Sequence, residues 1–139
     1  MEKIKQLSVF IENRAGRLSE VCSTLGKNNI NIRGFMIADT EGYGIFRVIV
    51  TNPEEAKPIL KKEGFTVNES NVICLDVPDK PGGLGEVLKI FSDNDLNVEY
   101  MYAIAGTKIV FSVEQIDEAV KSLREKGIKV LTSTEVSAL

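Results

Sequence analysis

Two segments of the chain repeat each other at an offset of 66 residues, and this repeat constrains the fold more than any other feature. The segment "NRAGRLSEV" at 13–21 recurs as "DKPGGLGEV" at 79–87, and "INI" at 30–32 recurs as "LNV" at 96–98. A second match, at an offset of 63, aligns 55–67 with 118–130, so the second copy has a shorter turn. The 139 residues therefore hold two copies of one small unit, which we place at residues 1–69 and 70–139.

Each copy has the pattern strand–helix–strand–strand–helix–strand. Apolar and polar residues alternate over 7–11, which predicts a strand, while apolar positions 18, 21, 22 and 25 fall on one face of a helix. The segments 30–38 and 44–50 flank a glycine-bearing turn and predict a hairpin. In the next helix, Pro58 indicates a start near 57–58 or a kink, and Gly64 indicates the end. Segments 65–69 and 128–133 are expected as closing strands.

This pattern predicts an α+β fold with two tandem ferredoxin-like βαββαβ units. In such a unit both helices cover one face of a four-stranded antiparallel sheet. A unit of roughly 65 residues is marginally stable alone because it buries too little of its surface. The connecting segment 68–71 is short, so we expect the two copies to pack together.

Composition narrows the possible functions. The net charge is −3 with both signs scattered, which argues against a nucleic-acid partner. The absence of His and of four closely spaced ligands leaves no expected cofactor or metal site. Cys22 and Cys74 fall at apolar positions and are expected as two buried free thiols. No apolar run approaches the ~20 residues of a membrane span and no signal peptide is evident, so a cytoplasmic protein is expected.

The repeated loop before each copy's first helix allows three interpretations. The glycine spacing of a phosphate-binding or dinucleotide loop is missing. As a purely structural corner, Asp79 and Pro81 would form the turn and the glycines would permit it. As a small-anion site, free backbone N–H groups at the helix N-terminus would attract a carboxylate, with Arg14, Arg17 and Lys80 adding positive charge.

An asparagine enters the second strand of each copy. Asn31 or Asn97 would either offer a carbonyl acceptor to an ammonium group or simply form a turn, and the pattern leaves both interpretations open.

The loop, the following L-x-x-[VC] helix and the "NINI" or "LNV" strand entry together resemble the ACT-domain family. The resemblance covers nearly the whole chain and is greatest to a small protein made of two tandem ACT domains. It implies a small effector, usually an amino acid, bound between paired domains at the loop and the strand entry. The residues that it implies for ligand binding are Asn13, Arg14, Ala15, Gly16, Leu18, Asn31 and Ile32, and in the second copy Asp79, Lys80, Pro81, Gly82, Gly83, Leu84, Asn97 and Val98.

The two copies differ in this motif. Ala15 stands where the family pattern has proline, and Gly83 stands where the first copy has Arg17, so the second copy is the closer match. The leading hypothesis is a non-catalytic, homodimeric regulatory protein that binds an amino acid at the inter-domain seam and acts on a partner enzyme. The alternative is a ligand-free assembly or docking module that pairs with itself or with a partner enzyme.

Two further functions are weaker. The segment "EGYGIFRV" at 41–48 resembles an RNA-binding strand, but Glu41, Ile45 and Val48 replace its basic and aromatic residues, so Phe46 is expected in sheet packing. No activated nucleophile or paired carboxylates indicate an enzyme. Tyr100 and Tyr102 share one strand face, which offers either a dimer surface or a packed core.

Overall fold

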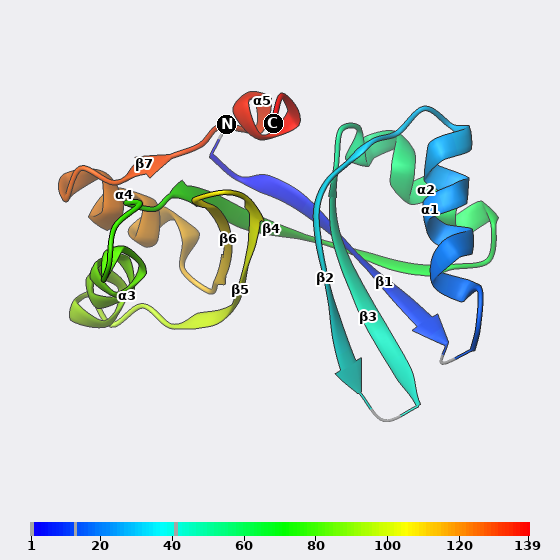
Figure 1. Ribbon diagram of the computed structural model, residues 1–139, viewed down its shortest axis with the longest axis horizontal. Helices are drawn as coiled ribbons and strands as arrows, with labels where there is room; N and C mark the ends of the chain where they lie inside the picture. The colour runs from blue at the N-terminus through cyan, green and yellow to red at the C-terminus, as the bar shows by residue number, and fades with distance from the viewer. Residues whose placement is uncertain (1, 13, 41) are drawn as a thin grey trace. The chain divides into compact units, whose positions relative to one another are not determined.

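The computed structural model describes residues 2–12, 14–40 and 42–139 (Figure 1). Its contacts divide the chain into two compact units, Lys5–Ser70, and Asn71–Leu139 together with the N-terminal segment through Ile4. The elements are β1 (Ile4–Glu12), α1 (Arg17–Lys27), β2 (Ile32–Thr40), β3 (Tyr43–Val50), α2 (Pro53–Lys62), β4 (Thr66–Asp76), α3 (Gly83–Asp93), β5 (Val98–Ala105), β6 (Lys108–Val113), α4 (Ile116–Glu125), β7 (Lys129–Val130) and α5 (Ser133–Ser137).

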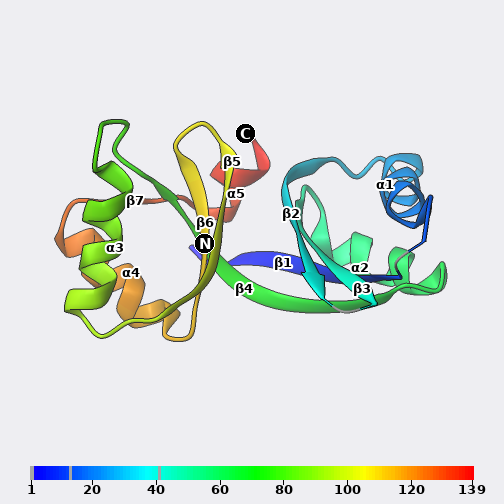
Figure 2. The same ribbon diagram turned by 60° about the horizontal axis from the view of Figure 1, so that its bottom comes forward.

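Both units are ferredoxin-like. The strand order is β2-β3-β1-β4 in the first unit and β7-β4-β6-β5 in the second. The central strand β3 is antiparallel to β1 and β2, as β6 is to β4 and β5. Helix α1 contacts α2, and α3 contacts α4, as the two views show (Figures 1 and 2). The predicted α+β class with two tandem βαββαβ units is confirmed.

Each unit has its own apolar core between sheet and helices. Alternate residues of β1, including Leu7 and Val9, pack with Val21 and Leu25 of α1. In the second unit Ile73 and Leu75 pack with Val87 and Phe91, and the Phe91 ring stacks on Phe111 with centroids 5.3 Å apart. Each such buried side chain contributes about 1.5–3 kcal/mol, so the period-2 and period-3.6 patterns decide which faces meet.

The four helices α1 to α4 end in the same way. The residue after each C-cap adopts a left-handed conformation, with φ of 59°, 90°, 55° and 76° at Asn29, Gly64, Asp95 and Gly127. After α2, the Gly64 N–H donates to Lys61 O at 3.0 Å and the Phe65 N–H donates to Leu60 O at 3.1 Å. This is the Schellman motif, which satisfies carbonyls that a helix end leaves free. The expected helix end at Gly64 is confirmed.

The predicted start of α2 near 57–58 was wrong. The helix begins at Pro53, because proline suits the first helical position, where its missing N–H removes no intrahelical bond. Pro58 lies within the helix, so a proline there removes one internal bond without ending the helix.

Two expectations about strands also need correction. The connecting segment 68–71 lies inside β4, which runs without interruption from Thr66 to Asp76. The last predicted strand, 128–133, is only two residues long and gives way to α5. There, Thr132 Oγ1 accepts from the Glu135 N–H at 3.1 Å, and the Glu135 carboxylate accepts from the Thr132 N–H at 2.9 Å. This capping box starts a helix where the apolar pattern indicated a strand.

Two aromatic residues of the sheets, Phe46 and Tyr102, are buried. Phe46 is in the core of its unit and its ring centroid is 5.8 Å from that of Phe35, so the expected packing role is confirmed and Phe46 is no platform for RNA bases. Met101 pairs with the core residue Phe111, which puts Tyr100 and Tyr102 on the opposite face. Tyr102 is nevertheless buried, which argues against its use as a dimer surface.

The expectation of two buried thiols was right for Cys74 and wrong for Cys22. Helix α1 buries Val21 and Leu25, and Cys22 is rotated by about 100° from Val21, which leaves it exposed. Partial desolvation by its neighbours still raises the pKa of the Cys22 thiol. Burial, with a smaller effect of the Asp76 carboxylate, raises the pKa of Cys74 to about 12. Neither thiol has the lowered pKa of a reactive cysteine.

Candidate functional site

The loop between β4 and α3 depends on two adjacent glycines for different reasons. Gly82 precedes the helix with φ of 83°, a left-handed conformation that favours glycine, and no side chain caps the helix. At Gly83 a Cβ atom would overlap the carbonyl oxygen of Pro78 and lie 3.0 Å from its carbonyl carbon. Gly82 is therefore required by backbone conformation and Gly83 by lack of space.

This loop presents backbone donors at the start of α3. The Gly83 N–H donates to Lys80 O at 2.9 Å, and the Glu86 N–H donates to Gly82 O at 2.9 Å. Within the described part of the chain, no acceptor is assigned to the N–H groups of Leu84 and Gly85. Helix N-termini carry a partial positive charge, so these two groups favour an anionic oxygen.

The loop between β1 and α1 has a similar backbone conformation, but the hydrogen bond that closes it is longer. Gly16 has φ of 85° and also precedes its helix without a side-chain cap. The Glu20 N–H donates to Gly16 O at 3.0 Å, but the distance from Arg17 N to Arg14 O is 3.4 Å, longer than its counterpart in the second loop. Ala15 and Leu18 are exposed here, and Asn13 lies outside the described residues.

The cations of the first loop are already paired. Arg14 lies 3.3 Å from the Glu12 carboxylate, and Arg17 lies 3.4 Å from Glu12 and 2.7 Å from Glu20. The guanidinium carbon of Arg17 is 3.9 Å from the centre of the Phe65 ring, and its side chain is only 11% exposed. The two cations and two carboxylates sum to zero, so this loop has little net attraction for an anion.

The second loop is more open. Its Lys80 ammonium lies 3.4 Å from the Glu86 carboxylate, with both side chains more than half exposed. Such a surface pair contributes little and is easily rearranged. Pro81 adds no charge and Asp79 adds a negative one, so a bound carboxylate would depend on the backbone N–H groups. This arrangement suits a zwitterion better than a bare anion.

The strand-entry asparagines lie far from the loops of their own units. In the first unit Glu12, Tyr43 and Thr40 are aligned at one end of the sheet, whereas Ile32 pairs with Val50 at the other end. Tyr43 and Val50 are seven positions apart along β3, which is about 23 Å at the rise of a strand. In the second unit Val98 pairs with Val113, while Asp76 and Ala105 pair with Lys108. One unit therefore does not bring loop and asparagine together.

Asn31 behaves as a turn residue. Its side-chain Oδ1 accepts from the Ile32 N–H at 2.8 Å, and its own N–H donates to Thr51 Oγ1 at 3.1 Å. Asn97 is exposed, and Val98 next to it is half-buried against the core.

The loop end of the second unit also contains polar residues that the sequence analysis missed. The Val77 N–H donates to Thr107 O at 3.0 Å, and Thr107 Oγ1 donates to the Asp76 carboxylate at 2.8 Å. Lys108 lies 3.5 Å from the same carboxylate. The hairpin pattern would have located these residues, because the tip of the hairpin and the loop belong to the same end of a ferredoxin-like sheet. Nothing in the sequence indicates that Phe65 lies against Arg17.

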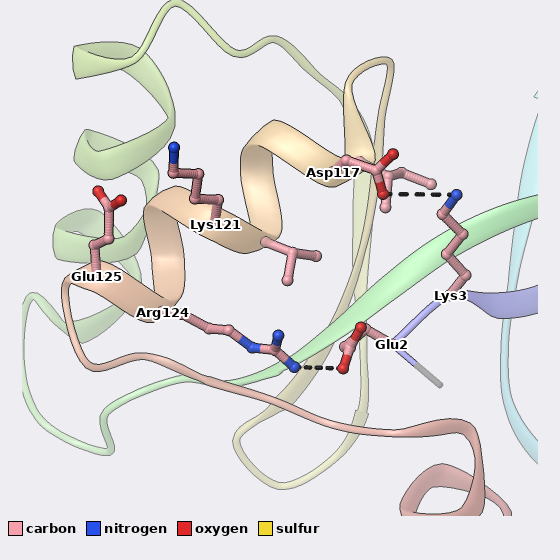
Figure 3. Close-up of a pocket in the computed structure, with 8 residues that line it drawn as sticks. Glu2, Lys3, Asp117, Lys121, Arg124 and Glu125 are labelled. Atoms are coloured by element: carbon pink, nitrogen blue, oxygen red, sulfur yellow. Dashed lines mark hydrogen bonds and ion pairs between the residues drawn. The ribbon is translucent and has the colours of Figure 1, made fainter.

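Two of the hollows that the described residues form lie elsewhere. One, of about 330 Å³, is lined by Ser19, Glu20, Ser23, Thr24, Lys27, Glu63 and Phe65. The other, of about 580 Å³, lies beside α4 (Figure 3). Among the described residues, no three His, Cys, Asp or Glu side chains gather as a metal site would require. No helix in that part of the chain combines the length and apolar character needed to cross a membrane.

Comparison with models of protein families shows which family this chain belongs to. A family model described as an ACT domain pair matches residues 2–139. The chain belongs to the ACT domain pair family. A crystallised protein from Bacteroides thetaiotaomicron is 36% identical, with a TM-score of 0.94 over 99% of this chain and 98% of that one. ACT domains are regulatory modules, so membership supports a regulatory, ligand-binding role.

Solved structures of lower sequence identity share the fold. The regulatory subunit of aspartate kinase from Thermus thermophilus has a TM-score of 0.65 at 13% identity, over 90% of this chain and 93% of that one. Aspartate kinase from Synechocystis has a TM-score of 0.62 at 15% identity, over 98% of this chain and 26% of that much longer one. A search of the curated proteins gave no match.

Proposed function

We propose that this ACT pair is a cytoplasmic, non-catalytic regulatory protein that binds an amino acid at the loop before α3. The observation that carries the proposal is the pair of N–H groups on Leu84 and Gly85, which follow the exposed Gly82, where a Cβ would meet nothing within 4 Å. The ligand carboxylate would meet these N–H groups, and loop carbonyls would accept from its ammonium group. The two ACT domains would be residues 1–69 and 70–139.

The strand-entry asparagine would come from a second copy of the chain. The described strands run in one order that ends at β2 in the first unit and at β5 in the second, and each of these two strands has an unpaired edge. Antiparallel pairing of β5 with β2 of a second copy would place the start of that β2 beside the end of β5. By register, the end of β5 is also the loop end of its unit. Asn31 of the second copy would then reach the ligand.

The surface of β2 supports such a homodimer. Two large apolar side chains of this edge strand are exposed: Phe35 is 58% exposed and Ile37 is 46% exposed. An exposed apolar edge strand is a template for pairing with another chain. If β2 pairs with β5 of the partner in both directions, the free edges of β2 and β5 are covered in both copies, and the closed dimer is the simplest symmetric solution.

The second candidate function is the ligand-free assembly or docking module, which acts on itself or on a partner enzyme. The same exposed edge supports it, as does the ion pairing of Arg14, Arg17 and Lys80, which leaves the loops without a strong charge for a ligand.

A thermal-shift panel of the twenty amino acids separates these two functions. At a hundredfold excess over Kd, binding adds about 2.7 kcal/mol, so one or a few amino acids should raise Tm by several degrees. Gly82→Asp should abolish the rise by placing a carboxylate at the helix N-terminus. Gly127→Asp is the matched control, because Gly127 has a similar φ of 76° but follows α4. A flat panel with folded protein would contradict ligand binding and favour the assembly module.

A further inference from the structure

The hollow beside α4 has the size and floor of a small-molecule site. It measures about 580 Å³, within the roughly 300–1,000 Å³ that ligand pockets occupy. Two aliphatic side chains, Ile116 and Val120, line it, and Val120 is almost fully buried. No residue of the hollow belongs to the loop before α3, so the hollow is separate from the site proposed above.

The N-terminal segment forms one wall, held by two ion pairs. The Lys3 ammonium lies 3.6 Å from the Asp117 carboxylate, and the Arg124 guanidinium donates to the Glu2 carboxylate. Figure 3 shows both pairs bridging from α4 to the N-terminal segment. The hydrogen bond from Arg124 lowers the pKa of Glu2, so this carboxylate is charged at neutral pH. Four of the six charges around the hollow are therefore matched within the protein.

The remaining two charges are Lys121 and Glu125. They lie one turn apart on α4 and line the hollow, and within the described part of the chain neither is assigned a hydrogen bond or an ion pair. Figure 3 shows their side chains directed away from the Glu2–Arg124 pair. Long side chains of this kind can turn toward a ligand without breaking an existing contact.

The charged side chains that line the hollow indicate which class of ligand it would bind. The rim carries three cations and three anions and is therefore neutral, which favours neither a simple anion nor a simple cation. A free ammonium and a free carboxylate beside an aliphatic floor are complementary to a molecule with both charges and an aliphatic body. We propose that this hollow binds a small aliphatic zwitterion, with Lys121 on its acidic group and Glu125 on its ammonium group.

The test adds three small molecules with the same aliphatic body to the protein and follows their binding by ¹⁵N NMR of the protein amides. L-Leucine carries both charges, 4-methylpentanoate carries only the carboxylate, and 3-methylbutylamine carries only the ammonium group. Leucine alone should shift the amide signals of α4 and of residues 2–3. Lys121→Gln and Glu125→Gln should each weaken that binding about tenfold, as expected for loss of one charge-assisted hydrogen bond. Lys126→Gln, on an exposed residue outside the hollow, should change nothing.

Three other outcomes would overturn the proposal, and a fourth would support it. Equal shifts with all three probes would mean that only the aliphatic body is bound. Leucine shifts confined to residues 79–86 would place binding at the loop alone and leave the proposed function standing. An absence of shifts with every probe would show that the hollow does not bind this class. Shifts at α4 without shifts at the loop would support the hollow while contradicting the loop site.

Discussion

The carbonyl oxygen of Pro78 occupies the space that a side chain on Gly83 would need. The matched position in the first copy is Arg17, whose side chain stacks on Phe65, and there the closing N–O distance lengthens from 2.9 to 3.4 Å. One loop is thus closed tightly by backbone contact, and the other is held by side chains. We expect the two loops to differ in ligand binding for this reason.

Gly83→Ala should therefore abolish binding of the stabilising amino acid. The added Cβ forces Pro78 and the start of α3 apart, which displaces the N–H groups of Leu84 and Gly85. Arg17→Ala should leave the stoichiometry at one ligand per chain, because it changes only the first loop. Isothermal titration calorimetry of both variants measures the affinity and the number of ligands bound per chain. Two ligands per chain in the native protein, or binding lost in the Arg17 variant, would contradict the assignment to the second loop.

Alanine substitutions at two glycines near the start of α3 should change the free energy of unfolding in opposite directions. Gly82→Ala should lower the free energy of unfolding by about 1–2 kcal/mol, because alanine disfavours a left-handed backbone. Gly85→Ala should raise it by up to about 1 kcal/mol, because Gly85 lies within the helix and a Cβ there would contact nothing within 4 Å. Urea unfolding provides both values. A loss in the Gly85 variant would show that its backbone is not helical.

Charges on the edge strand should prevent self-association. Phe35→Lys with Ile37→Lys should give a monomer in sedimentation, with an unchanged circular dichroism spectrum because both side chains are about half exposed. Leu139→Lys is the control, since Leu139 is also exposed but follows α5 and belongs to no strand. A variant that remains dimeric would place the interface elsewhere.

The two cysteines should differ in labelling and in their effect on alkaline stability. A thiol reagent should modify Cys22 in the folded protein and Cys74 only after unfolding. The pKa of Cys74 is raised from 9.0 to about 12, so the folded state holds its proton more tightly than the unfolded state. This contribution is complete below pH 9 and is lost between pH 9 and 12, at up to about 1.4 kcal/mol per pH unit.

Cys74→Ala isolates that contribution. The variant loses a constant amount of stability from repacking, but its unfolding free energy should fall less steeply with pH above 9 than that of the native protein. Parallel curves for the two proteins would show that the Cys74 thiol is not buried as described.

Much of this fold follows from local patterns. The offset between Gly16 and Gly82 identifies the repeat, and the apolar spacing over Val21, Leu25, Val87 and Phe91 identifies the inward faces of the helices. The end of α2 at Gly64 also follows from the sequence, because a left-handed residue after a helix is a local requirement that glycine meets best. These features depend on neighbours within a few residues, so a single sequence contains them.

The rest depended on contacts between distant residues. The continuous strand through 68–71 and the pairing of Lys3 with Asp117 each involve an element that no local pattern specifies. The sequence alone determined two ferredoxin-like units with a shared loop motif. Only the tertiary structure decided that each loop and its asparagine lie at opposite ends of a sheet, because strand register is set by pairing across the whole unit.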